Sequence, residues 1–326
     1  MLEFLNNKDI HYIENPAILA GQTGLMVDPG VINQLKQYQL VIIDLSIEHW
    51  GNSVSQYNEL LKDTKLNYII LSHHYLDHLT SPRVFFYPHY YYWSMENFIS
   101  ANNMDLISPR KYKISCLNAN PRSHRILNYL KFKQKSYYND CLFTFHNINP
   151  GGLAWRNDDL VLSASVTQAW ESIRNILPSR DQLGTSELFA LDSTINNSAY
   201  VDSYINLATE TTTSPRVFAS EKIWKPVAAG QLFLVLGNPN SIAYLRDQGV
   251  DVFDDVIDHK YYDSELDCET RIDKIHALID SLVQQDLHKI YQDTAERRLL
   301  NVNNFNNKKF DPRYHKDLIE CINTLN

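Results

Sequence analysis

The fold is decided by the stretch SEKIWKPVAAGQLFLVLGN, which occupies residues 220–238. Its first half predicts a helix, because a serine hydroxyl suits a helix start, where it accepts a bond from an orphan backbone N–H group. Gly230 ends that helix, and residues 232–236 form an apolar run with the length and composition of a buried parallel strand. A helix followed directly by such a strand predicts an α/β fold.

The same stretch places two cations where an anion can bind. Lys222 and Lys225 are three residues apart and therefore share one face of the predicted helix. The exposed N–H groups of a helix start also attract anions. If this face lines a cleft, we expect a phosphate or diphosphate there; if it faces water, the lysines are the ordinary surface charges of an amphipathic helix.

Upstream segments extend the α/β pattern. The apolar runs QLVIIDL (residues 39–45) and NYIIL (residues 67–71) flank a segment of helical character at 53–62. Strand, helix and strand in this order form the repeating unit of a parallel sheet, whose ligands bind beyond the carboxyl ends of the strands. Further strands are expected at residues 83–87, 113–117, 140–146, 200–208, 232–236 and 250–253, and helices at 241–248, 269–285, 287–302 and 312–325.

A second cationic helix start follows the strand at residues 113–117. Pro121 is permitted at the opening of a helix, because its missing N–H group would have had no partner there. Arg122 and Arg125 then share one face. These arginines are either a second anion site at a strand end or ordinary charges on a helix surface.

Length and composition limit the classes of protein to which this chain can belong. A chain of 326 residues is long enough for two domains, and a net charge of −8 argues against nonspecific binding to nucleic acid. The four cysteines form no CxxC pair, and no apolar run has the length of a membrane span. We therefore expect a cytoplasmic protein, with peripheral attachment to a membrane surface left open. Residues 147–159, rich in Asn, Gly and Asp, predict a domain boundary that divides the chain into 1–150 and 151–326.

The phrase SEKIWKPVAAG resembles the donor-binding segment of two-domain glycosyltransferases of the GT-B type, in particular the fucosyltransferase-like families. The resemblance covers roughly residues 200–262. It implies two Rossmann-like domains that face each other across a cleft, and it implies that Ser220, Glu221, Lys222 and Lys225 hold a nucleotide-sugar. The phrase TET at residues 209–211 resembles the same families and makes Glu210 a candidate for binding sugar or ribose hydroxyls. The segment with Arg122 and Arg125 resembles one that supplies an arginine to the donor phosphates.

The function implied is transfer of a sugar from a nucleotide-activated donor to a hydroxyl of a surface glycan or glycolipid. Residues 1–150 would hold the acceptor and residues 151–326 the donor, with the last helix packing back on the N-terminal domain. Enzymes of this type usually invert the anomeric centre and need no bound metal or other cofactor. The Trp-Lys-Pro continuation departs from the commonest fucosyltransferase form, which leaves GDP-fucose, a CMP-ulosonic acid and similar donors open.

Inverting transfer needs a general base for the acceptor hydroxyl. The titratable residues after the first two predicted strands are Glu48, His49, His74, Asp77 and His78. We favour Glu48, because it lies close to Trp50, whose indole face suits stacking on a sugar. Asp77 and then His74 are the next candidates.

The histidine-rich segment at residues 73–78 supports a rival function. Its SHHYLDH context nearly matches the HxHxDH motif of metallo-β-lactamase-like hydrolases, but Tyr75 stands where that motif has a histidine. Without the full spacing a metal site is not expected, and these histidines serve equally well in capping or packing. A metal-dependent hydrolase and a non-catalytic sugar-binding subunit remain the alternatives to a glycosyltransferase.

Overall fold

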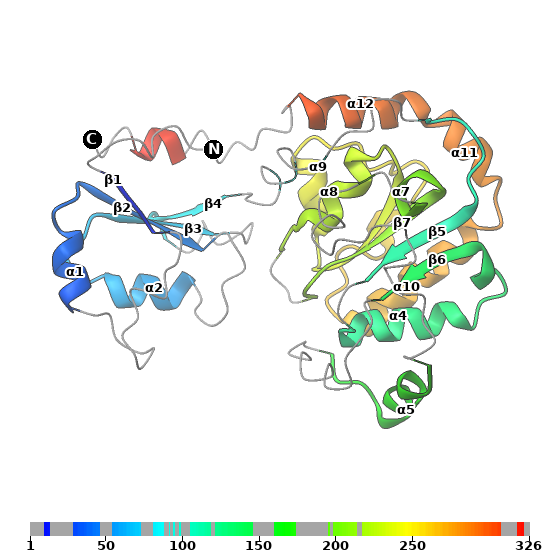
Figure 1. Ribbon diagram of the computed structural model, residues 1–326, viewed down its shortest axis with the longest axis horizontal. Helices are drawn as coiled ribbons and strands as arrows, with labels where there is room; N and C mark the ends of the chain where they lie inside the picture. Colours follow the sequence, from blue (N-terminus) through cyan, green and yellow to red (C-terminus); the bar gives the residue numbers. More distant parts are fainter. Residues whose placement is uncertain are drawn as a thin grey trace. The chain divides into compact units, whose positions relative to one another are not determined.

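The chain forms two compact units in the computed structural model. The first unit combines Met1–Tyr92 with Asp311–Asn326, and the second spans Trp93–Phe310. Each unit is organised around one four-stranded parallel sheet, so the chain is a mixed α/β protein (Figure 1). The residues that the structure describes are 10–13, 29–45, 54–72, 81–87, 91, 94, 98, 105–118, 121–145, 160–173, 195, 198–213, 217–307 and 318–322.

The strands of the first unit follow the order of the sequence. They are β1 (Ile10–Ile13), β2 (Leu40–Leu45), β3 (Tyr68–Ser72) and β4 (Val84–Phe86), and each pairs in parallel with the next. Helix α1 (Pro29–Leu35) lies between β1 and β2 in the chain, and α2 (Val54–Leu61) lies between β2 and β3. Among these four strands the order never reverses.

Alternate residues of this sheet supply two separate cores. On one face, Val41, Ile43 and Ile70 pack with the apolar residues of α1 and α2. On the other, Ile42 and Leu71 pack with Leu318 and Ile322, which belong to the helical segment 318–322. The described residues 318–322 thus cover one face of the first sheet. Successive side chains of a strand point to opposite faces of the sheet, and here both sets are apolar, so both faces must be packed against other elements.

The second unit has a different strand order. Its sheet is β6-β5-β7-β8, all parallel, with β5 (Tyr112–Leu117) and β7 (Ser203–Thr209) in the centre. The chain leaves β5 through α4 (Ser123–Lys133) and a short 3-10 helix η4 (Tyr138–Asp140) to reach β6 (Cys141–Thr144) on one side. It returns through α5 (Ala164–Ile173) and α7 (Ser198–Val201) to β7, and then passes through α8 (Glu221–Ala228) to β8 (Leu232–Leu236) on the other side.

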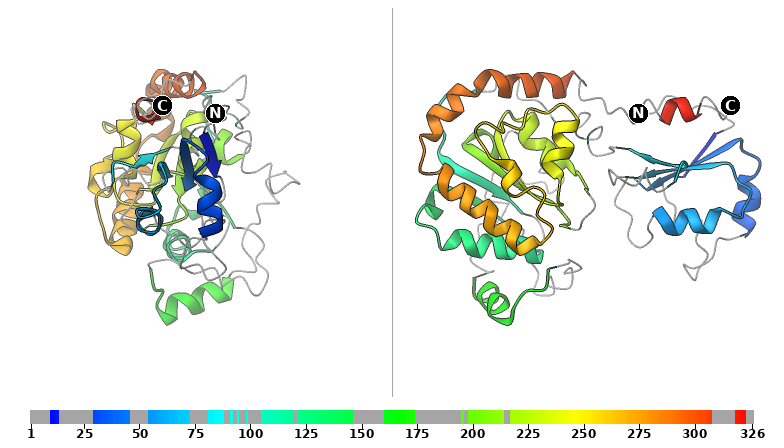
Figure 2. Two further views of the ribbon diagram at one scale, coloured as in Figure 1. Left: turned by 90° about the vertical axis from the view of Figure 1, so that its left-hand side faces the viewer. Right: turned by 180° about the vertical axis from the view of Figure 1, so that it is seen from behind.

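Helices cover both faces of this second sheet (Figures 1 and 2). On one face α4 packs against α10 (Cys268–Leu282), where the Phe132 and His276 rings lie 4.4 Å apart. On the other face α8 packs against α12 (Ala295–Asn306), where the Trp224 and Phe305 rings lie 6.2 Å apart. Sheet and helices thus form three layers, with the parallel sheet between two layers of helices. The remaining helices are α9 (Ser241–Asp247), η8 (His259–Tyr261) and α11 (Leu287–Asp293).

Helix α8 begins and ends as its sequence predicts. Ser220 is the N-cap residue, and its side chain accepts a hydrogen bond from the Lys222 backbone N–H. At the other end Gly230 adopts a left-handed conformation with φ of 60°. Its N–H donates to Val227 O at 3.2 Å, and the N–H of Gln231 donates to Pro226 O at 2.9 Å. These two bonds close the helix and let the chain turn at once into β8.

Three expectations from the sequence need correction. The division falls between Tyr92 and Trp93 rather than near residue 150, because β5 and β6 belong to the second sheet. Residues 250–253 form no strand, although Val250, Val252 and Phe253 are buried; Phe253 has a positive φ of 62°, which interrupts an extended chain. The helix expected at 287–302 is two helices, α11 and α12, which meet at Thr294.

Candidate anion-binding site

The strand order of the second unit points to one end of its sheet. The chain moves to opposite sides after β5 and after β7, and these two strands are neighbours. In open α/β sheets, ligands bind outside the carboxyl ends of the strands at such a reversal. Asn118 and Glu210 directly follow the two strands, and the Thr209 hydroxyl donates to Asn118 Oδ1 at 2.8 Å, which ties the ends together.

Glu210 lies fully buried at this end of the sheet. Its Oε1 accepts from the Ser220 backbone N–H at 2.9 Å, and its Oε2 accepts from the Ser220 hydroxyl at 2.6 Å. The Thr211 N–H donates to the same Oε2 at 3.3 Å. The carboxylate therefore fixes the start of α8. We had expected it to bind ligand hydroxyls, whereas these contacts are made within the chain.

Gly237 makes room for the Glu210 side chain. A Cβ atom at this position would lie 3.0 Å from both Cβ and Cγ of Glu210, tighter than most real Cβ contacts. Glycine therefore lets the loop after β8 approach Glu210 without displacing its side chain.

Helix α4 brings two arginines to the same place, and they differ in their surroundings. Arg125 is buried, and its Nη2 donates to the carbonyl oxygens of Thr209 at 3.0 Å and Glu210 at 2.9 Å. Arg122 is the half-buried N-cap residue of α4, and within the described part of the chain its side chain makes no hydrogen bond or ion pair. Arg125 therefore supports the strand end, and Arg122 is available to a ligand.

Helix α8 presents an ion pair at its first turn. Lys222 Nζ lies 2.7 Å from Glu221 Oε1 and 3.2 Å from Ser220 Oγ. Both side chains are partly accessible, with 26% of Lys222 and 13% of Glu221 exposed. Lys225, one turn further on, is buried with its ammonium 6.0 Å from the centre of the Phe98 ring. Of the two lysines that share the helix face, Lys222 is the one that a ligand can reach.

The pKa values of these groups show that they act on one another. Burial opposes the charge of Glu221, but Lys222 and Lys225 outweigh it and bring the Glu221 pKa to about 2. Burial likewise opposes the charge of Lys222, yet Glu221 and Glu210 raise its pKa. The Glu210 pKa is raised, chiefly by burial. Burial and, secondly, nearby Arg122 lower the Arg125 pKa to about 10.

The site that results has an excess of positive charge. Four of the expected residues are cations and two are acids. All of them except Lys225 lie with Ser220 around the starts of α4 and α8, and Lys225 lies one turn further along α8. These two helix starts add the partial positive charge of their dipoles. An anion with more than one charged group, such as a diphosphate, suits this arrangement. The residues are Arg122, Arg125, Glu210, Ser220, Glu221, Lys222 and Lys225.

Residues that we had not singled out complete the support of this site. His124 is fully buried, and its Nε2 lies 3.0 Å from the Glu210 carbonyl oxygen. Asn118 and Thr209 join the two strand ends, as described above. Asn118 and Thr209 could have been recognised from their position in the sequence, because each is a polar residue at or directly after the end of an apolar strand.

The expected catalytic residues Glu48, His74 and Asp77 lie outside the described residues, as do His49 and the rest of the 73–78 segment. Across the described ranges, no group of three His, Cys, Asp or Glu side chains is placed to hold a metal ion. No described helix combines the length and apolar character needed to cross a membrane.

Comparison with known proteins leaves the family of this chain open. No protein-family model matches the sequence, and no curated protein is significantly similar to it.

Proposed function

We propose that this protein is a glycosyltransferase that binds the nucleotide-diphosphate or nucleotide-monophosphate part of an activated sugar at the carboxyl end of the second sheet. The observation that carries the proposal is the pairing of two cationic helix starts, α4 with Arg122 and α8 with Lys222, beside the strand reversal. A leaving phosphate gains negative charge during glycosyl transfer, and preorganised cations and helix dipoles stabilise that charge.

The contacts of each residue suggest which ones would bind the phosphate and which ones would hold the site in place. Arg122 offers an uncommitted guanidinium, which can bind two phosphate oxygens at once. The Lys222 ammonium is already held in place by its hydrogen bonds to Glu221 and Ser220. A phosphate would therefore bind an ammonium group that is ordered beforehand. Glu210 and Arg125 hold the two helix starts in place through Ser220 and through the end of β7. The buried groups thus orient the accessible ones.

We further propose that the two units are the halves of a GT-B enzyme, with the acceptor bound by the first unit. The donor would be GDP-fucose, a CMP-ulosonic acid or a similar nucleotide-sugar, and the acceptor a surface glycan or glycolipid. Glu48 is then the favoured general base. Replacing it by Gln should lower the maximal rate at least ~100-fold and leave nucleotide binding unchanged.

The test is a calorimetric and thermal-shift screen of the full chain against CMP, GDP, UDP and divalent metal ions, followed by transfer assays with the nucleotide that binds. We expect one nucleotide to bind and to raise the unfolding temperature. Lys222→Ala should weaken transfer by about 2–4 kcal/mol in transition-state free energy, while Lys36→Ala, in the first unit, should have no effect. Dependence on a metal ion without nucleotide binding would favour the hydrolase, and binding of sugars without turnover would favour the sugar-binding subunit.

A further inference from the structure

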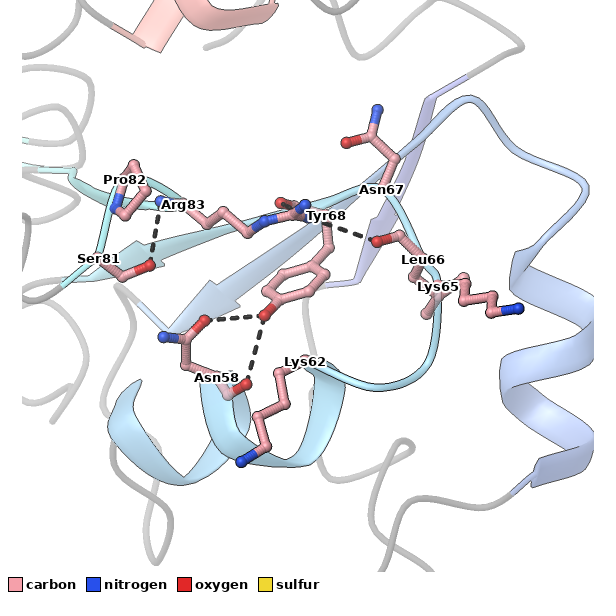
Figure 3. Close-up of a pocket in the computed structure, with 9 residues that line it drawn as sticks. All are labelled: Asn58, Lys62, Lys65, Leu66, Asn67, Tyr68, Ser81, Pro82 and Arg83. Atoms are coloured by element: carbon pink, nitrogen blue, oxygen red, sulfur yellow. Dashed lines mark hydrogen bonds between the residues drawn. The ribbon is translucent and has the colours of Figure 1, made fainter.

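A polar pocket lies in the first unit, at the amino ends of β3 and β4. It has a volume of about 470 Å³, is open to solvent on one side, and is bordered by the end of α2, the turn that follows it and the entry to β4 (Figure 3). Ligands of parallel α/β sheets usually bind at the opposite, carboxyl ends of the strands. This cavity therefore needs an explanation of its own.

Three cations line the cavity, and two of them lack an acidic partner. Lys62 forms an ion pair with Glu59, and the charge of Asp63 also stabilises its protonated form. Across the described ranges, no acidic side chain pairs with Lys65 or Arg83. Cations from two separate segments thus border one pocket, and among the described residues Lys65 and Arg83 have no acidic partner, which favours an anionic ligand.

Arg83 is held in position before any ligand arrives. Its Nη1 donates to the carbonyl oxygens of Leu66 and Tyr68 at 3.4 Å each, and its guanidinium lies 4.7 Å from the centre of the Tyr68 ring. Tyr68 is fixed in turn, because its hydroxyl donates to Asn58 Oδ1 at 2.8 Å. Within the described residues, the other guanidinium N–H groups of Arg83 make no hydrogen bond. A guanidinium fixed in this way binds an oxyanion with little further loss of entropy.

Lys65 occupies a backbone position that disfavours its residue type. Its φ is 58°, in the left-handed region where glycine or asparagine is the usual residue. A lysine at such a position is strained relative to glycine. Lys65 borders the pocket, and its exposed side chain points away from Arg83 in Figure 3, so it would have to turn toward the pocket to contact an anion held by Arg83.

We propose that this cavity binds the phosphate group of a phosphate ester, with Lys65 and Arg83 as its charged contacts. Its volume falls within the range of small-molecule sites and exceeds the needs of a bare ion, so a group larger than phosphate is expected. Asn58 and Asn67 provide amide groups at the wall for the uncharged part of the ligand. The site is separate from the one in the second unit and does not depend on the function proposed there.

The experiment measures binding of glycerol 3-phosphate to the full chain by calorimetry, with sedimentation of phosphatidylcholine vesicles with and without phosphatidic acid as a second arm. Saturable binding of glycerol 3-phosphate identifies a free phosphate ester as the ligand. Sedimentation only with phosphatidic acid identifies a lipid headgroup. Either result supports the phosphate site, provided that it responds to the variants that follow; absence of both overturns it.

Three variants make the test specific. Lys65→Gly should weaken binding at least tenfold while its unfolding midpoint stays the same or rises, because glycine tolerates the left-handed conformation. Arg83→Gln should weaken binding to a similar degree. Lys36→Ala removes an exposed lysine of the same unit outside the cavity and should leave binding unchanged. The proposal is overturned if the first two variants bind normally, or if Lys36→Ala weakens binding equally.

A fourth variant excludes the site in the second unit. Lys222→Ala should retain the binding of glycerol 3-phosphate and its sensitivity to Lys65→Gly. If Lys222→Ala abolishes that binding instead, the phosphate occupies the second unit and the inference about the first unit is wrong.

Discussion

At the scale of single residues, burial separates the groups that support the site from those that a ligand can reach. Arg122 and Arg125 share a helix face and have the same chemistry, but only Arg125 is tied to backbone carbonyls. The sequence could not make this distinction, because both arginines are predicted on the same face of one helix. Glu210 is a similar case, since an acid directly after a strand looks the same whether it faces a ligand or the protein interior.

Exchanging each arginine for alanine should therefore affect a different property, stability for Arg125 and ligand binding for Arg122. Arg125→Ala leaves two buried carbonyl oxygens without their charged donor and should lower the free energy of unfolding by about 2–4 kcal/mol. Arg122→Ala should change stability by less than about 0.5 kcal/mol but weaken binding of the donor nucleotide. Urea unfolding and calorimetry measure the two quantities. Equal loss of stability in both variants would show that Arg122 also has a supporting role.

Glu221 should contribute to stability in a defined range of pH. Its folded-state pKa of about 2 lies below the ordinary value of 4.5, so its contribution is complete above pH 4.5 and is lost as the pH falls toward 2. The difference is worth on the order of 3 kcal/mol. The gap in unfolding free energy between the wild type and Glu221→Gln should therefore narrow by about this amount between pH 5 and pH 2. A gap that stays constant would contradict the ion pair with Lys222.

At the scale of elements, the sequence predicted most strands and helices correctly because their apolar periods are clear. The runs at 39–45, 67–71 and 232–236 became β2, β3 and β8. Residues 250–253 misled us because burial without strand pairing gives the same apolar pattern; here Val252 O lies 2.8 Å from His259 Nε2 instead of pairing with a strand. The boundary was misplaced because residues 147–159 lie in a connection between β6 and β7 of one sheet, and turn-rich composition does not distinguish such a connection from a linker.

The loop after β8 offers a test of how the site is assembled. Gly237→Ala would place a Cβ atom 3.0 Å from the Glu210 side chain, which must then shift by a few tenths of an ångström from the position in which it bonds Ser220. Crowding of this kind typically costs about 1–3 kcal/mol, and we expect the unfolding free energy to fall by that amount. Nucleotide affinity should fall as well, because the start of α8 loses its anchor. Unchanged stability and affinity would mean that Glu210 does not position α8.

At the scale of the whole molecule, two sheets with separate cores share one chain. The net charge is −8, yet both candidate anion sites concentrate cations locally, which a total charge cannot reveal. The order β6-β5-β7-β8 locates the site of the second unit, and strand order is set by long-range pairing that local periodicity does not encode. The last segment of the chain belongs to the first unit, although the whole second unit separates it in sequence from the rest of the first unit.

This return of the chain leads to a prediction about the last helical segment. Leu318 is fully buried against the first sheet, whereas its neighbour Ile319 is 36% exposed. Leu318→Ala should therefore destabilise the first unit by about 2–5 kcal/mol, while Ile319→Ala should have little effect. Because the second unit has its own core, its unfolding and its nucleotide binding should be unchanged in Leu318→Ala. Calorimetric melting of the full chain should show an earlier transition for one unit alone; a single transition shifted as a whole would mean that the two units unfold together.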